Sequence, residues 1–150
     1  MGHTHSCLPV HLVFSTKNRF PWLMADIEER AHQYLCRLSE TVRATPIEIG
    51  GMPDHIHVLA LLPASLSVSD FAKRIKGSSS RWIKESFPDR LGFSWQDGFS
   101  AFNVSKSQMG RVQKYIASQC EHHKHMTYQE EYLLLLKQHS ITYDEEHLWD

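Results

Sequence analysis

Hydrophobic positions divide the first part of the chain into a strand and a helix. Branched and aromatic residues cluster at Val10–Ser15, which predicts a β-strand. Pro21 then interrupts the chain, and Asp26 followed by Glu29 resembles the start signal of a helix. The hydrophobic residues that follow have the spacing of one helical face: Ile27, Ala31, Tyr34, Leu38 and Val42. This helix must end before Pro46.

The middle of the chain predicts two strands and a second helix. Ile47–Ile49 is a short strand, and Gly50-Gly51 with Pro53 is expected to form a turn. The next strand runs from His55 to Leu62 and ends at Pro63. A helix is expected from near Ser67, with one apolar stripe that comprises Val68, Phe71, Ile75 and Trp82.

The last third predicts extended segments followed by helices. Phe93–Trp95 and Phe99–Val104 are expected to be extended, with Asp97-Gly98 as a hairpin-like turn between them. Ser105 and Gln108 have the spacing of a capping box, which would open a helix through about His123. A further helix is expected at Thr127–Gln138, and the remaining tail has a less regular pattern.

The order of these elements predicts an α+β fold. Strand, helix, strand, strand, helix and strand match a ferredoxin-like (split β-α-β, RRM-like) antiparallel sheet with helices on one face, followed by C-terminal helices. The 150 residues suit a single domain, residues 1–150, with a core at about 8–125 and a helical extension at about 126–150. The second face of the sheet is then open or covered by another element.

Strand geometry places two histidines side by side. Side chains alternate between the faces of a strand, so His55, His57, Leu59 and Leu61 share one face. Ile56, Val58, Ala60 and Leu62 share the other, which we assign to the helix-packed core. The leucines beside the histidines require an apolar cover. The predicted helix that carries Met109, Val112, Ile116 and Cys120 can supply it, from the same chain or from a partner.

The covering helix carries two further polar groups at helical spacing. Tyr115 and Gln119 lie at i and i+4, so they occupy one side of that helix. Two imidazoles and an amide oxygen suit a divalent cation such as Mg²⁺ or Mn²⁺. The phenol of Tyr115 could attack phosphorus. Each group also has an ordinary interpretation: hydrogen-bonded histidines, a core or interface tyrosine, and a solvated glutamine.

Other histidines and the cysteines favour simpler interpretations. His3 and His5 lie near a terminus. His122, His123 and His125 could approach a metal or a phosphate, but we favour their interpretation as cationic groups at a helix C-terminus. Three widely spaced cysteines, Cys7, Cys36 and Cys120, indicate buried thiols rather than a disulfide framework or a zinc site.

Charge and hydropathy limit the partners and the location. The net charge is −1, low for a nucleic-acid-binding domain, but one segment is basic and contains Lys73, Arg74, Lys76 and Arg81. These four residues are candidate phosphate contacts, or simply a solvated helix face. No apolar run approaches the length of a membrane span, and no signal pattern opens the chain, so we expect a cytoplasmic protein.

Several separated motifs, in order, resemble the small single-tyrosine HUH transposases of the insertion sequence 200/605 type and their REP-associated relatives. HUH denotes His-hydrophobe-His. The resemblance extends over about Val10 to Trp149. The motifs are His11–Arg19, Gly51–His57, Trp95–Phe99, Tyr115–Gln119 with His122-His123 close behind, and Ile141–Glu145.

The resemblance implies a function and assigns roles. His55, His57 and Gln119 would bind a divalent cation, and Tyr115 would cleave single-stranded DNA, leaving a 5′-phosphotyrosine and a 3′-OH. It also implies hairpin-bearing DNA as partner, a homodimer, and a nucleoid-associated protein. Two alternatives stay open: a domesticated or inactive relative that binds hairpins without strand transfer, and a metal hydrolase or ligand-binding protein of the same fold.

Overall fold

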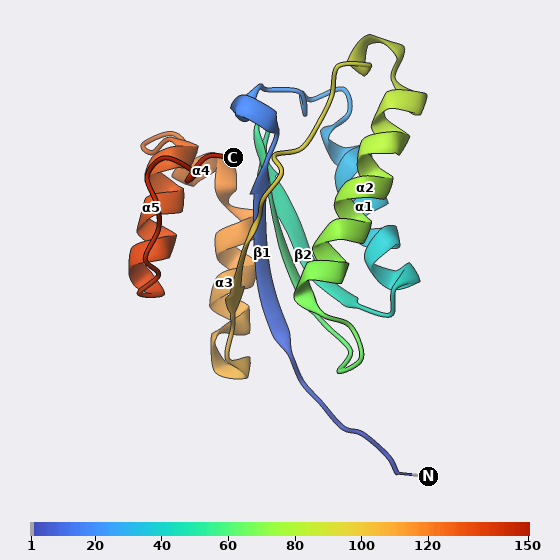
Figure 1. Cartoon of the computed structure of the whole chain (residues 1–150), viewed down its shortest axis with the longest axis vertical. Helices are drawn as coiled ribbons and strands as arrows, with labels where there is room; N and C mark the ends of the chain where they lie inside the picture. Colours follow the sequence, from blue (N-terminus) through green and yellow to red (C-terminus); the bar gives the residue numbers. More distant parts are fainter. Residues whose placement is uncertain (1) are drawn as a thin grey trace.

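A four-stranded antiparallel sheet forms the centre of the molecule, with strand order β2-β3-β1-β4. The computed structural model describes residues 2–150 (Figure 1). The strands are β1 (Pro9–Ser15), β2 (Thr45–Met52), β3 (His55–Leu61) and β4 (Ser100–Asn103). Antiparallel pairing of β1 with β3 places Val13 opposite His57 and Ser15 opposite His55, so the histidines lie on a central strand.

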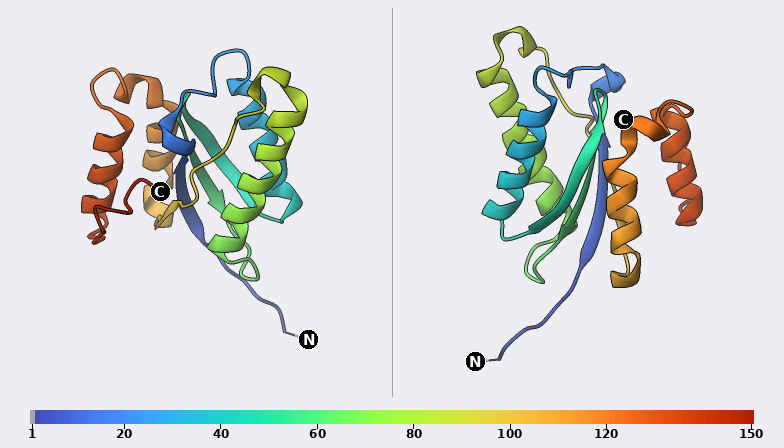
Figure 2. Two further views of the ribbon diagram at one scale, coloured as in Figure 1. Left: turned by 45° about the horizontal axis from the view of Figure 1, so that its top comes forward. Right: turned by 180° about the vertical axis from the view of Figure 1, so that it is seen from behind.

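Helices cover both faces of this sheet, as the two views in Figure 2 show. The helices on one face are α1 (Glu28–Thr41) and α2 (Val68–Ser86). Those on the other are α3 (Met109–Ala117), the short α4 (Gln119–His122) and α5 (Tyr128–Gln138). Single 3-10 turns occur at Lys17–Arg19, Pro88–Arg90 and Lys106–Gln108. The predicted ferredoxin-like α+β fold with added C-terminal helices is therefore confirmed.

The main core lies between the sheet and the pair α1 and α2. As the alternation in β3 predicts, Ile56, Val58 and Ala60 are buried in it, together with side chains from α1 and α2 that include Leu35 and Phe71. Burying a large apolar side chain contributes roughly 1.5–3 kcal/mol, so this layer provides much of the stability that fixes β3.

The opposite face is covered from within the same chain. Leu59 is buried against Ile116 of α3, and Met109 and Val112 pack around them. The predicted cover is thus confirmed, except that Cys120 is exposed. Helix α5 extends the cover over β1 and β4. The buried residues of that second cluster are Val13, Phe102, Tyr128, Tyr132, Leu135 and Leu136.

Two predicted turns are wrong. Gly50 and Gly51 belong to β2, where they lie opposite His57 and Ile56, and the connection to β3 is made by Pro53-Asp54. Phe93–Trp95 and Phe99–Val104 do not form a hairpin, since β4 pairs with β1 instead.

The segment before β4 is held by side chains instead of a ladder. Trp95 makes one isolated bridge with Thr16 and packs its ring edge-on against Phe14. The ammonium of Lys76 donates to the carbonyl oxygens of Gln96 and Gly98 at 2.8 and 2.7 Å. Lys76 thus gives two carbonyl oxygens of this segment a hydrogen-bond donor in place of a strand partner.

Two predicted helix starts are confirmed and carry a capping residue, whereas two predicted caps and one predicted helix end are wrong. Ser67 accepts the backbone N–H of Asp70, and Thr127 forms a capping box with Glu130. Asp26 caps nothing, because it forms an ion pair with Arg90 at 2.8 Å. Ser105 makes no cap bond, and the helix predicted through His123 breaks at Ser118.

The surface differs from expectation at the cysteines. Cys7 and Cys120 are exposed and Cys36 is partly buried, so the interpretation as buried thiols is wrong.

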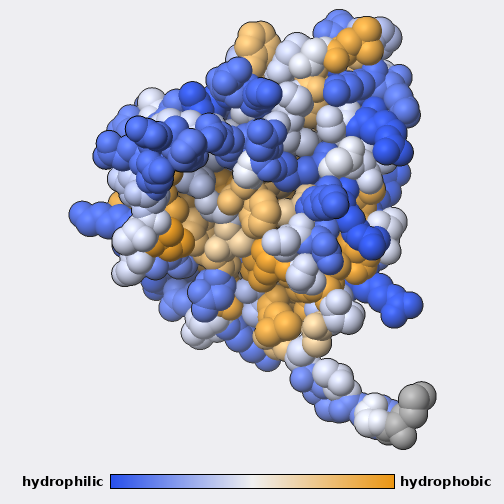
Figure 3. Space-filling view, in the orientation of Figure 1, coloured by the Kyte–Doolittle hydropathy of each residue, from blue (hydrophilic) through white to orange (hydrophobic). Residues whose placement is uncertain are grey.

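Apolar surface gathers in Figure 3 along the β4 edge of the sheet, between the helical layers. Within residues 2–150, no helix has the length and apolar character required to cross a membrane.

Candidate active site

His55 and His57 lie side by side beneath the α3 and α5 layer, and both are fully buried. Each ring is oriented through its Nδ1. His55 Nδ1 lies 2.7 Å from Asp54 Oδ1, and His57 Nδ1 lies 2.8 Å from Nε2 of His11 on β1. Such partners fix ring orientation and tautomer in metal sites. Both Nε2 atoms therefore face the same space.

Gln119 and Tyr115 reach this space from the helical layer, as the sequence predicts. Gln119 Oε1 lies 2.9 Å from His55 Nε2, and the ring of Tyr115 lies 5.8 Å from that of His57. The two residues are not on one continuous helix, since the break at Ser118 places Gln119 at the first turn of α4. All four predicted catalytic and metal residues converge within a single chain.

A buried carboxylate that the sequence analysis missed lies at the centre of this group. Glu131 of α5 is 1% exposed. Its Oε1 lies 3.1 Å from His57 Nε2 and 3.3 Å from His55 Nε2. Its Oε2 accepts hydrogen bonds from Gln119 Nε2 at 2.9 Å and from the Tyr115 hydroxyl.

A signal for Glu131 was present in the helix pattern. Residues at i, i+3, i+4 and i+7 form one helical face, and Glu131 stands in the stripe that Tyr128, Tyr132 and Leu135 otherwise make apolar. An acid in a buried stripe requires partners, because an unpaired buried charge costs several kcal/mol.

His123 also joins the cluster, which agrees with the less favoured interpretation of these histidines and not with that of a helix-end cation. Its Nε2 lies 3.0 Å from Gln119 Oε1 and 3.1 Å from Glu131 Oε1. His122 packs its ring 4.5 Å from that of Tyr115. His125 is exposed and donates its backbone N–H to the carbonyl oxygen of His122, and His3 and His5 are exposed in the N-terminal segment that extends away from the sheet (Figure 1).

Burial and hydrogen bonds shift the pKa values of the histidines in this cluster in different directions. Burial disfavours charge on His55, but hydrogen bonds to Asp54 and Glu131 outweigh it and raise the pKa of His55 to about 9. Burial dominates at His57 and lowers its pKa. Burial, together with the charge of His57, lowers the pKa of His11 to about 3. His11 and His57 therefore act as neutral imidazoles near pH 7.

The surroundings keep Glu131 ionised and Tyr115 protonated. Burial raises the pKa of Glu131, but hydrogen bonds from His123, His55 and His57 outweigh it and hold this pKa far below its ordinary value. Burial and the negative charge of Glu131 raise the pKa of Tyr115 well above that of a free phenol. Tyr115 is therefore protonated and donates to a carboxylate.

The donor set fits a divalent cation. His55, His57 and Glu131 offer ligand atoms that all lie within 4.8 Å of one another, and Gln119 Oε1 is adjacent. Neighbouring ligands of an octahedral cation with bonds of about 2.1 Å stand about 3.0 Å apart. The spacings of 2.9–3.3 Å between these atoms match that requirement.

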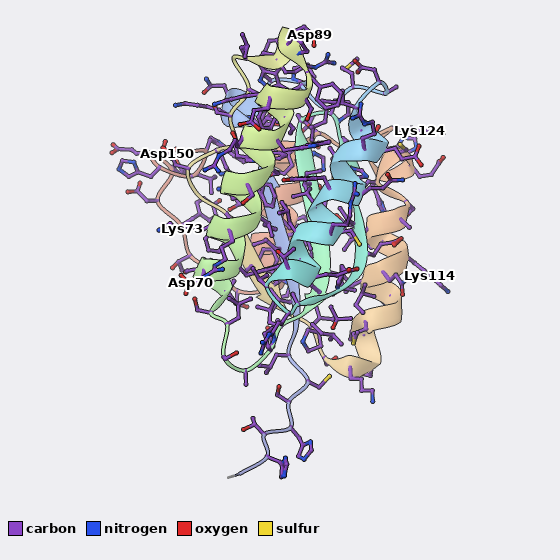
Figure 4. The ribbon with its side chains drawn as sticks, turned by 90° about the vertical axis from the view of Figure 1, so that its right-hand side faces the viewer. Asp70, Lys73, Asp89, Lys114, Lys124 and Asp150 are labelled. Atoms are coloured by element: carbon purple, nitrogen blue, oxygen red, sulfur yellow. The ribbon has the colours of Figure 1, made fainter. Side chains whose placement is uncertain are left out.

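The basic residues of α2 lie apart from this cluster, on the other side of the sheet. Figure 4 shows Lys73 projecting from α2, and Lys114, which precedes Tyr115, projecting from α3 in the opposite direction. Lys73, Arg74 and Arg81 are exposed. Lys76 is half-buried with its ammonium bound to backbone carbonyls, which occupies its donors.

Two pockets flank the histidine cluster. One of about 520 Å³ has Tyr115 and His11 in its wall, together with Arg111 of α3 and His139 beyond α5. The other, of about 620 Å³, is bounded by Asp54, His123 and Lys124 among others. The cluster is therefore approached from two sides by space that a polymer segment could occupy.

Comparison with known proteins shows which family the chain resembles. Residues 4–119 match the family model for IS200-like transposases. The transposase for insertion sequence element IS200 of Salmonella typhimurium is 31% identical over 130 residues, covering 83% of this chain and 84% of that protein. The ISDra2 transposase TnpA of Deinococcus radiodurans is 28% identical, covering 75% and 84%.

Solved structures share the fold. A crystal structure of a protein from Deinococcus radiodurans r1, described as a transposase, has a TM-score of 0.66 at 25% identity and covers 79% of this chain and 96% of its own. A REP-associated tyrosine transposase bound to a REP hairpin has a TM-score of 0.56 at 15% identity, covering 77% and 70%.

The fold and these matches together define a DNA-processing enzyme of the transposase class. The chain belongs to the IS200-like transposase family. The matched residues 4–119 include the histidine pair, Tyr115 and Gln119, whereas α5 and its Glu131 lie beyond them.

Proposed function

We propose that this transposase cleaves and rejoins single-stranded DNA through a covalent bond to Tyr115. The observation that carries the proposal is the convergence of Tyr115, Gln119 and the two histidines around one buried point of a single chain. His55, His57 and Gln119 would hold a divalent cation, Mg²⁺ or Mn²⁺. Such an ion, when bound, neutralises charge that develops on the phosphoryl oxygens.

The chain's own residues then perform the remaining steps. Glu131 Oε2 accepts the hydrogen bond of the Tyr115 hydroxyl, which fixes the direction of the phenol, and the phenol proton passes to water as the P–O bond forms. The phenol oxygen attacks the scissile phosphorus and forms a P–O bond. The bond from phosphorus to the 3′ oxygen breaks, and that oxygen takes up a proton from water.

The products of this step are a 5′-phosphotyrosine and a free 3′-OH. Strand joining is the reverse reaction with a different 3′-OH. That hydroxyl attacks the phosphotyrosine phosphorus, loses its proton, and releases the phenol of Tyr115. Because the phosphodiester energy is retained in the tyrosine linkage, no nucleotide cofactor is required for rejoining.

The shape of the site favours a single strand as substrate. Tyr115 is half-buried and lines the pocket of about 520 Å³ that also has Arg111 and His139 in its wall. Arg111 can pair with a phosphate, and the histidine rings can stack on a base.

We propose a DNA hairpin as the recognised feature, as the motif resemblance implies. The neighbour with the same fold that was solved with a REP hairpin is consistent with this choice of probe. Exposed Lys73, Arg74 and Arg81 are proposed phosphate contacts outside the cleavage site. A homodimer in the cytoplasm, on nucleoid DNA, would join two sites that are each complete within one chain.

The experiment is covalent capture of a labelled single strand. The strand should carry a palindrome from the DNA that flanks the coding region and be incubated with Mn²⁺. We expect a protease-sensitive protein–DNA adduct that Tyr115→Phe abolishes while hairpin binding is retained.

The matched control is Tyr128→Phe, because Tyr128 stacks its ring 4.5 Å from that of His55 and is the nearest rival phenol on α5. This variant should form the adduct. An undiminished adduct in Tyr115→Phe would refute the assignment. Hairpin binding without an adduct in the wild-type chain would favour a relative that only binds DNA.

A further inference from the structure

The position of Glu131 is the feature that the family assignment does not explain. Its carboxylate is 1% exposed and lies on α5, outside the residues that the family model matches. A charged group at that depth is tolerated only when it is paired or bound to a metal. The Glu131 carboxylate therefore requires specific partners, and the groups around its two oxygens indicate what they are.

The two oxygens of Glu131 face different groups. Oε1 lies 3.3, 3.1 and 3.1 Å from the Nε2 atoms of His55, His57 and His123. Oε2 accepts hydrogen bonds from Gln119 and Tyr115. Oε1 thus faces the same space as the ligand atoms of the proposed metal site. Oε2 connects α5 to Tyr115 through a hydrogen bond.

The orientation of the two histidines favours a cation in that space. Nδ1 of His55 is occupied by Asp54, and Nδ1 of His57 by His11, so their free nitrogens converge on Oε1. Imidazole nitrogens and an amide oxygen bring no negative charge. A divalent cation in a buried site gains most from a carboxylate, which is the ligand that Mg²⁺ and Mn²⁺ prefer.

We infer that Glu131 is itself a ligand of the divalent cation, so that α5 completes a site formed by His55, His57, Gln119 and Glu131. The inference rests on the proposed function, which supplies the cation. It adds a ligand to the three that the motifs imply. It also makes docking of α5 and metal binding mutually stabilising, because a ligand that binds only the docked state shifts the equilibrium toward it.

Metal titration of the DNA-free full-length chain tests this inference. Mn²⁺ affinity should be measured by calorimetry and by electron paramagnetic resonance for the wild type, Glu131→Gln, Glu130→Gln and His57→Ala. We expect Glu131→Gln to weaken Mn²⁺ binding by about tenfold or more. Glu130→Gln makes the same change one residue away, where glutamine still serves the capping box, and should bind like the wild type.

The outcomes separate this inference from the proposed function. If Glu131→Gln binds Mn²⁺ as tightly as the wild type, or more tightly, while His57→Ala loses binding, then Glu131 is no ligand although the metal site stands. If the wild type binds no Mn²⁺, the metal chemistry of the proposed function fails, and the role of Glu131 fails with it.

A spectroscopic readout covers the case in which Glu131→Gln does not fold. Wild-type protein with ¹³C-labelled glutamate carboxyl groups should show a strong Mn²⁺–¹³C coupling by electron–nuclear double resonance. Within residues 2–150, Glu131 is the glutamate whose carboxylate lies against His55 and His57. Bound Mn²⁺ without that coupling would overturn the assignment.

Discussion

Replacing Gly50 by alanine should push α3 away from the sheet and disrupt the catalytic cluster. Gly50 lies opposite His57 in the β2–β3 ladder, on the face that α3 covers. A Cβ built at this position would lie 2.5 Å from the carbonyl oxygen of Ile116 and 3.0 Å from its Cγ2. Because the nearest atom is backbone, no side-chain rotation can relieve the contact.

The size of the displacement follows from that distance. Contacts of this kind are not found below 3.0 Å and become ordinary at 3.4 Å. The carbonyl of Ile116 must therefore retreat by about 0.5–0.9 Å, since close-packed interiors offer no slack. Tyr115 directly precedes Ile116, and Gln119 follows three residues later, so both move relative to His55 and His57.

Misplacement of this size is costly for both stability and chemistry. Overpacking in a core costs roughly 1–3 kcal/mol. A displacement of about 1 Å can reduce a rate by about a hundredfold, so we expect a roughly 10- to 100-fold slower formation of the Tyr115 adduct. Mn²⁺ affinity should fall as well, because Gln119, a proposed ligand, is displaced from His55 and His57.

The assay compares adduct formation and Mn²⁺ binding in Gly50→Ala with the same measurements in Gly110→Ala. Gly110 lies in α3 itself, and a Cβ there meets nothing within 4 Å. Alanine at that site should stabilise the helix by roughly 0.5–1 kcal/mol and leave the chemistry unchanged. Wild-type rates and affinity in a folded Gly50→Ala would refute the argument that this close approach positions the site.

Two other substitutions test the electrostatics. Asp54→Asn removes the carboxylate that orients His55 through its Nδ1, and we expect Mn²⁺ affinity measured by calorimetry to fall by about 10- to 100-fold; an unchanged affinity would show that the ring is oriented by packing alone. His32, on α1, has a buried Nε2 without a partner, and burial lowers its pKa from 6.5 to about 4. The unfolded chain therefore binds a proton between pH 6.5 and 4 that the folded chain excludes, so stability falls as the pH falls through this range. His32→Leu should reduce that acid loss by about 3 kcal/mol in urea unfolding at pH 7 and pH 4, and an equal loss in both proteins would contradict it.

The sheet and the histidine pair could be predicted because their patterns are local. Alternation along β3 assigns His55 and His57 to one face without reference to the rest of the chain. The need to cover Leu59 on that face then indicates α3, and Ile116 confirms it. The same pattern did not establish whether the cover comes from the same chain, since that depends on how the connection after β4 folds.

The remaining features depend on partners distant in sequence. Gly50 resembles a turn residue, but it is needed for the close approach of α3, 66 residues later. Asp26 resembles a cap, but Arg90 takes its carboxylate. Glu131 resembles a surface acid on an amphipathic helix until its contacts with His55 and His57 are known. In each case a tertiary contact outweighs the local preference.

The measurement that tests the central claim most directly is the identification of the residue that carries the DNA. The adduct should be digested with nuclease and trypsin, and the peptides should be analysed by mass spectrometry. Cleavage after Lys114 and Lys124 gives one peptide with Tyr115, and the following peptide, 125–137, contains Tyr128 and Tyr132. We predict a nucleotide 5′-phosphate on the peptide 115–124, at Tyr115. Nucleotide on the peptide 125–137, or on neither, would contradict the account.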